Sequence, residues 1–113
     1  MNNKTRILNN GMIIPLIGMG TPRIIDVITL GNVVIKENNI RDVIYNSIKD
    51  GVRLIDTSYL FGNEKEVGEG IRKALDEGIC KREDLIIIGK VWIHFRKDPA
   101  KALEETLKKL QLD

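Results

Sequence analysis

Two charged side chains stand where apolar strands are expected to end, and together they could form a catalytic ion pair. Asp56 ends the strand-like segment 52–56, and Lys90 follows the apolar segment 85–88 after a single glycine. Many α/β enzymes hold their catalytic groups at the carboxyl ends of parallel strands, and a lysine beside a fully apolar strand is costly unless its charge is paired. Because neighbouring strands lie about 4.8 Å apart, we predict an ion pair between Asp56 and Lys90.

Each of these two residues also has a plainer interpretation. Asp56 could be a turn-forming aspartate that caps the next segment, and Lys90 could extend its amine from the strand end into solvent. Taken alone, each residue favours its structural interpretation, so the catalytic one needs a further signal.

Three other features could carry chemistry, but for each the structural interpretation is stronger. The Gly-Met-Gly sequence at 18–20 could suggest a phosphate-binding loop, but it lacks a third glycine. His94 is the only histidine and lies in a basic loop, where exposure to solvent is more typical than catalysis. Cys80 precedes Lys81 and Arg82, whose charge could lower its pKa, yet an ordinary loop thiol is the favoured interpretation.

The elements that would position the ion pair alternate between strands and helices. An Asn-Gly pair at 10–11 supplies the positive φ angles of a tight turn, which predicts a β-hairpin over residues 6–14. A Gly-Asn turn within residues 26–36 could form a second hairpin. Three strands of one sheet are expected over residues 15–21, 52–56 and 85–88.

Three amphipathic helices are expected between and after the strands. Asn39 can cap the first of them, which Gly51 ends, and Asp98 with Pro99 suits the start of the last. Alternation of this kind predicts right-handed crossovers and a parallel sheet, so the fold class is α/β. The helices are expected over residues 40–50 and 63–77, and from residue 99 onward.

Side chains alternate between the two faces of such a sheet with period two. If Asp56 faces away from the helices, Leu54 and Val52 are expected on the same face. Arg53 and Ile55 would then face the helix layer.

Composition limits the classes of partner. The 113 residues are enough for one domain, and 42% of them are hydrophobic while 30% are charged. The net charge is +2 with basic residues scattered among acidic ones, which argues against nucleic-acid binding. No apolar stretch approaches the roughly 20 residues that span a bilayer, and no metal site is expected. A single cysteine favours the reducing cytoplasm.

Several ordered motifs resemble the aldo-keto reductase family. They are Leu-Asn-Asn-Gly at 8–11, Gly-Met-Gly-Thr at 18–21, the segment 51–68 and Gly-Lys-Val-Trp at 89–92. The resemblance implies the amino-terminal portion of a (β/α)8 barrel domain, with the hairpin followed by about three βα units. It also implies reduction of small aldehydes and ketones with NADPH as the cofactor.

The same resemblance assigns site residues by position. Asp56 and Lys90 match the catalytic aspartate and lysine, and Asp56 also lies beside the cofactor. Gly20 and Thr21 match backbone that contacts the cofactor. Trp92 matches a residue that lines the substrate pocket.

The chain departs from the family at the position of the catalytic tyrosine, which is Phe61. A phenyl ring cannot act as a general acid, and loss of acid–base catalysis typically removes roughly 10²–10⁴-fold in rate. Tyr59 is a disfavoured alternative donor. The family's histidine and phosphate-binding half would lie beyond Asp113, Pro22 replaces an aromatic residue, and residues 22–39 exceed the family's first loop.

The leading expectation is an aldo-keto-reductase-like chain with little or no activity alone. One alternative is a longer parent that works as an oxidoreductase with an unusual proton donor. The other is a non-catalytic module that pairs its open sheet edge with a partner or with a second copy of itself.

Overall fold

A computed structural model describes residues 4–22 and 39–113. The hairpin considered for residues 26–36 lies outside the described residues. The strands are β1 (Thr5–Ile7), β2 (Ile13–Pro15), β3 (Met19–Gly20), β4 (Leu54–Asp56) and β5 (Ile86–Ile88). The helices are α1 (Ile40–Lys49), α2 (Glu64–Asp76) and α3 (Pro99–Leu110), with single 3-10 turns η1 (Tyr59–Phe61), η2 (Arg82–Asp84) and η3 (Ile93–Phe95).

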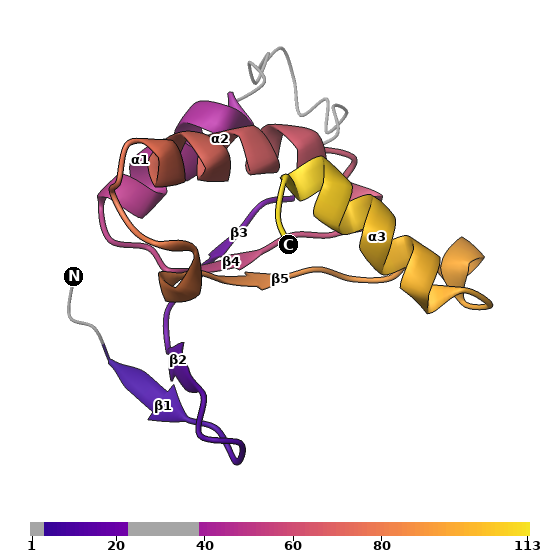
Figure 1. The fold of residues 1–113 in the computed structure, drawn as a ribbon, viewed down its shortest axis with the longest axis horizontal. Helices are drawn as coiled ribbons and strands as arrows, with labels where there is room; N and C mark the ends of the chain where they lie inside the picture. Colours follow the sequence, from indigo (N-terminus) through magenta and orange to yellow (C-terminus); the bar gives the residue numbers. More distant parts are fainter. Residues whose placement is uncertain (1–3, 23–38) are drawn as a thin grey trace, which may run out of the picture.

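The described strands form a parallel sheet and a separate hairpin. β3, β4 and β5 pair in that order with β4 in the centre, and β1 pairs with β2 in antiparallel fashion. Figure 1 shows α1 and α2 lying over one side of the sheet, while the hairpin extends away from it on the other side. The predicted α/β arrangement is confirmed, and these three parallel strands form an open sheet.

The strand expected over residues 15–21 is wrong as a single element. Pro15 pairs with Thr5, and the main-chain nitrogen of Leu16 donates to the oxygen of Lys4 at 2.9 Å, so this part belongs to the hairpin. Only Met19–Gly20 pairs with β4. The parallel sheet therefore begins only after the chain has left the hairpin.

The predicted helix starts are confirmed at α1 and α3. Asn39 Oδ1 accepts from the main-chain nitrogen of Asp42 at 3.4 Å. Asp98 Oδ1 likewise accepts from Lys101 at 3.0 Å, with Pro99 as the first helical residue. These side chains satisfy N–H groups that a helix leaves without partners in its first turn.

The core lies between the sheet and the helices. Ile55 in β4 is fully buried, and Met19 and Ile87 occupy the neighbouring positions in register and pack against the same core. Asp56 is on the opposite face, as predicted. Val52 packs against the helix-side core, contrary to the expectation, because it precedes β4 and does not follow the strand's alternation.

A surface contact between α1 and α2 gives a pH-dependent prediction. The Tyr45 hydroxyl donates to Glu77 Oε2 at 2.5 Å. This hydrogen bond, then burial and the charge of the Glu77 carboxylate, raise the pKa of Tyr45. We expect Glu77→Gln to lower the pH at which Tyr45 ionises. The ionisation is measured as phenolate absorbance in a Tyr59→Phe background, which leaves Tyr45 as the single tyrosine.

The sign of the linked stability follows from that shift. Because the pKa of Tyr45 is raised on folding, the contact stabilises the fold below the ordinary tyrosine pKa of about 10. The contribution is lost as the pH rises through the higher pKa of the folded state. An identical ionisation curve in Glu77→Gln would contradict the assignment.

Candidate active site

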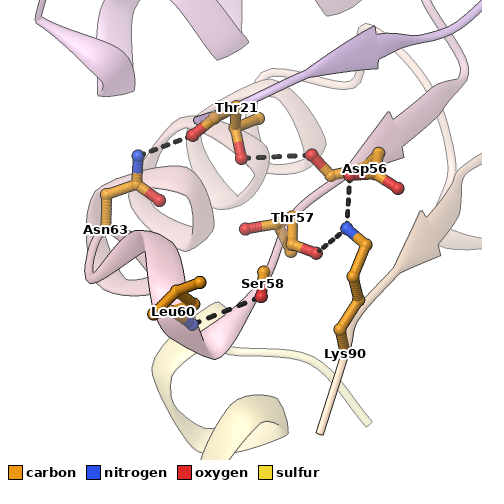
Figure 2. Close-up of polar contacts among 7 residues, drawn as sticks. All are labelled: Thr21, Asp56, Thr57, Ser58, Leu60, Asn63 and Lys90. Carbon is orange, nitrogen blue, oxygen red and sulfur yellow. Dashed lines mark hydrogen bonds and ion pairs between the residues drawn. The ribbon is translucent and has the colours of Figure 1, made fainter. Parts of the chain in front are cut away.

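An ion pair joins the ends of two neighbouring strands. Lys90 Nζ donates to Asp56 Oδ1 at 2.5 Å and to the main-chain oxygen of Thr57 at 2.9 Å (Figure 2). The predicted pair is therefore confirmed, and its part in catalysis stays a prediction. The side chains of Lys90 and Asp56 are 46% and 40% exposed, so solvent screens the pair and it adds little to stability.

The sheet register brings the pair together. Asp56 lies opposite Gly20 in β3 and opposite Ile88 in β5. Beyond the strands, the main-chain nitrogen of Thr57 donates to the Ile88 oxygen at 2.8 Å. Lys90 is two residues past Ile88, so its long side chain reaches back across the strand ends to Asp56.

Phe61 lies beside the lysine. It ends η1, a turn in which Ser58 Oγ accepts from the main-chain nitrogen of Leu60 at 3.2 Å and Gly62 closes the turn with φ +64°. Lys90 Nζ is 5.2 Å from the centroid of the Phe61 ring, within the range of a cation–π contact. The Phe61 ring therefore lies next to the ammonium group of the ion pair.

Tyr59 has different neighbours. Its ring meets Phe95 edge-on, with centroids 5.1 Å apart, and Lys109 Nζ lies 4.4 Å from its centroid. Tyr59 thus contacts η3 and α3, whereas Phe61 contacts Lys90. These contacts do not favour Tyr59 as a substitute for the missing hydroxyl.

The end of β3 lies directly against the ion pair. Thr21 is 2% exposed, and its main-chain nitrogen and Oγ1 lie 3.0 and 3.1 Å from the main-chain oxygen of Asp56. Gly20 is exposed, and a Cβ built on it would meet only Pro22 at 3.5 Å. The backbone of Gly20 is therefore open to a ligand beside Asp56.

Trp92 lies on a groove that also includes the lysine. The groove has a volume of about 170 Å³ and runs between the segment after β5 and α3. Lys90, Trp92, Tyr59 and Phe95 line it together with apolar residues of α3 such as Leu107. The structure therefore brings Trp92 and Lys90 together on a mainly apolar surface, and the part of Trp92 in a substrate pocket stays a prediction.

The remaining candidates keep their structural interpretations. His94 is exposed and meets Trp92 edge-on, with centroids 6.2 Å apart. Burial raises the pKa of the Cys80 thiol, with Arg53 acting in the opposite direction, so the thiolate is not favoured. Among the residues that the structure describes, no group of three or more histidine, cysteine, aspartate or glutamate side chains could hold a metal ion.

Two buried polar residues beside the site were missed by the sequence analysis. Asn63 is 2% exposed, and its Nδ2 donates to the Thr21 oxygen at 2.8 Å. Glu64 is also 2% exposed, accepts from Thr106 Oγ1 at 2.9 Å and lies 3.6 Å from Lys109 Nζ. From helical periodicity, both residues could be recognised only as the start of α2. The one local sign of their burial was that two polar residues come directly before a helix with a buried face.

Comparison with known proteins identifies the family. The sequence is 41% identical over 113 residues to an NAD(P)H-dependent D-xylose reductase of Kluyveromyces lactis, an alignment that covers 97% of this chain and 31% of the relative. It is 42% identical over 108 residues to an NADPH-dependent aldose reductase of Saccharomyces cerevisiae, covering 94% of this chain and 30% of that protein.

The fold agrees with these relatives. An aldo-keto reductase of Bombyx mori, solved in complex with NADP, matches with a TM-score of 0.83 and 34% identity, covering 100% of this chain and 36% of that chain. The chain belongs to the aldo-keto reductase family. It spans about a third of the length of the aldo-keto reductases that it matches, and its open sheet corresponds to part of their barrel. No protein-family model matches it.

In residues 4–22 and 39–113, each helix is too short or too polar to cross a bilayer.

Proposed function

We propose that the chain is part of an NADPH-dependent carbonyl reductase that lacks the proton donor of its active site. The observation that carries this proposal is Phe61, which lies with its ring 5.2 Å from the Nζ of the paired lysine, Lys90. The relatives named above, xylose and aldose reductases, support the reaction class. Small carbonyl compounds are the proposed substrates.

Each residue of the site has a distinct part in this proposal. Asp56 orients the Lys90 ammonium group, whose charge would stabilise the negative charge that develops on a carbonyl oxygen. Phe61 has no proton to donate, so that step lacks its general acid. Trp92 would form a wall of the substrate site.

The open backbone at the end of β3 fits a nicotinamide nucleotide. Gly20 leaves the main chain accessible, Thr21 is held against Asp56, and the Asp56 carboxylate is partly exposed to meet a sugar hydroxyl. NADPH, when bound, supplies the hydride for the carbonyl carbon. The lone thiol, Cys80, supports a reducing compartment such as the cytoplasm.

NADPH titration of the purified chain, followed by fluorescence, tests the proposal. Saturable binding is expected if Gly20, Thr21 and Asp56 suffice to hold the nucleotide. We expect no oxidation of NADPH with a generic aldehyde, either by the chain itself or by Phe61→Tyr, because these residues span only about a third of their relatives. Turnover by the unmodified chain would contradict the proposal, and so would a chain that folds but binds no nucleotide. Turnover gained only by Phe61→Tyr would support the missing donor and contradict only the expectation that these residues are too few to act alone.

A second candidate is a module that pairs with another chain through its sheet edge. β5 is at an edge of the described sheet, and Ile88 on its face is 38% exposed. Ile13 and Ile17 add exposed apolar surface near the hairpin. Such edges and faces favour association. Sedimentation of the same sample decides: a stable dimer favours this candidate, and a monomer that melts in one sharp transition counts against it.

A further inference from the structure

A buried side-chain amide joins the residue before α2 to the end of β3. The bond from Asn63 Nδ2 to the Thr21 oxygen spans 42 positions of sequence (Figure 2). Asn63 immediately precedes α2, where asparagine usually caps the helix by accepting from a main-chain N–H. Within the residues that the structure describes, Asn63 makes no such cap bond.

The orientation of Asn63 leaves half of its amide without a partner. Its Oδ1 is buried and accepts no hydrogen bond from the described residues. A buried polar atom without a partner costs free energy. Asparagine avoids that cost at α1, where Asn39 turns to accept from Asp42. The Thr21 carbonyl, rather than its own helix, therefore sets the orientation of Asn63.

Thr21 passes this constraint on to the ion pair. Its main-chain nitrogen and its Oγ1 both donate hydrogen bonds to the main-chain oxygen of Asp56. The carboxylate of Asp56 accepts from Lys90. One connected set of hydrogen bonds thus runs from α2 across β3 and β4 to the segment after β5.

We infer that Asn63 is a positioning residue for the nucleotide-contacting end of β3. It holds the Thr21 carbonyl, fixes the exposed backbone of Gly20 relative to Asp56, and couples that backbone to the turn that carries Phe61. The nucleotide part of the inference rests on the proposed function. The coupling itself rests only on the contacts described here.

Hydrogen exchange of single main-chain amides tests the coupling without a cofactor. Asn63→Ser keeps a good capping residue, but serine is too short to reach the Thr21 carbonyl. We expect exchange of the Thr21 amide to become about 10-fold faster, the usual effect of one unmade buried hydrogen bond. The amide of Ile86, which donates to the Arg53 oxygen at 2.8 Å, should keep its rate.

Asn39→Ser is the matched control, because it makes the same change at the cap of α1. It should leave exchange at Thr21 unchanged. If Asn63→Ser does not fold, Asn63→Asp takes its place, since aspartate also caps helices but has no N–H to donate. Four results would overturn the inference: an unchanged Thr21 rate, equal acceleration at Thr21 and Ile86, an equal effect of Asn39→Ser, or failure of both Asn63 variants to fold.

NADPH titration of the same proteins separates this inference from the proposed function. If the unmodified chain binds NADPH, Asn63→Ser should weaken the affinity about 10-fold and Asn39→Ser should not. Equal affinities would overturn the nucleotide part of the inference. If the unmodified chain binds none, the proposed function fails, while the exchange rates still decide whether Asn63 positions Thr21.

Discussion

Phe61→Tyr is expected to raise the kcat of carbonyl reduction by roughly 10²- to 10⁴-fold in a chimeric enzyme. In this chimera, residues 4–113 replace the matching segment of the Kluyveromyces lactis xylose reductase. The added hydroxyl would be carried by a ring that lies beside Lys90, whose Nζ is 5.2 Å from the ring centroid. A nearby positive charge favours the ionised form of a phenol and lowers its pKa. That brings a proton donor closer to the operating pH, where general acids are most effective. The measurement is kcat with an aldehyde and NADPH.

The chimera separates the missing hydroxyl from the missing length of chain. Tyr59→Phe is the control, because it changes one hydroxyl two residues upstream, on a ring that lies against Phe95 and Lys109. It should leave kcat unchanged. If the chimera with Phe61 already reduces aldehydes as fast as its parent, the prediction that Phe61 leaves the site without a proton donor is wrong. Loss of that activity in Tyr59→Phe would then identify Tyr59 as the donor.

Gly70→Ala should destabilise the chain by about 2 kcal/mol, although alanine is the better helix former by about 1 kcal/mol. Gly70 lies in α2 where it crosses α1. A Cβ at this position would be 2.5 Å from the main-chain oxygen of Arg41 and 2.8 Å from the Cβ of Ile44. Neither atom can move without separating the two helices over the buried core. The midpoint of urea unfolding should fall accordingly.

Gly89→Ala is the matched control for the effect of an added methyl group. A Cβ at Gly89 would meet only the Thr106 methyl at 3.5 Å, which is ordinary contact. Its unfolding midpoint should stay close to that of the unmodified chain. If Gly70→Ala were neutral or stabilising, the close crossing of α1 and α2 would be wrong.

Local patterns were enough to predict the helices, the hairpin and the ion pair. Asn39 and Asp98 act within one turn of their own helices, and the Asn-Gly turn acts between adjacent strands. Asp56 and Lys90 could be paired in advance because strand alternation and the spacing of parallel strands are the same in every sheet. Such signals depend on residues that are near in sequence, so the sequence carries them without knowledge of the packing.

Expectations failed where the hydrogen bonds of one segment were shared between two partners. Residues 15–21 had the composition of one strand, but the main chain pairs with the hairpin as far as Leu16 and with β4 only at Met19–Gly20. Val52 likewise lies outside the regular strand and turns toward the helix side. A strand boundary of this kind depends on which neighbouring segment the main chain pairs with in the folded structure, and composition does not record it.

The amino-acid sequence by itself determined the family, the order of strands and helices, the Asp56–Lys90 pair and the missing hydroxyl at Phe61. Only the tertiary structure decided that Asn63 bonds Thr21 instead of capping α2. It also decided that Glu64 is buried against α3. The physical reason is distance along the chain: both contacts join residues 42 positions apart, and they form only where packed helices and strands bring the partners within hydrogen-bonding reach.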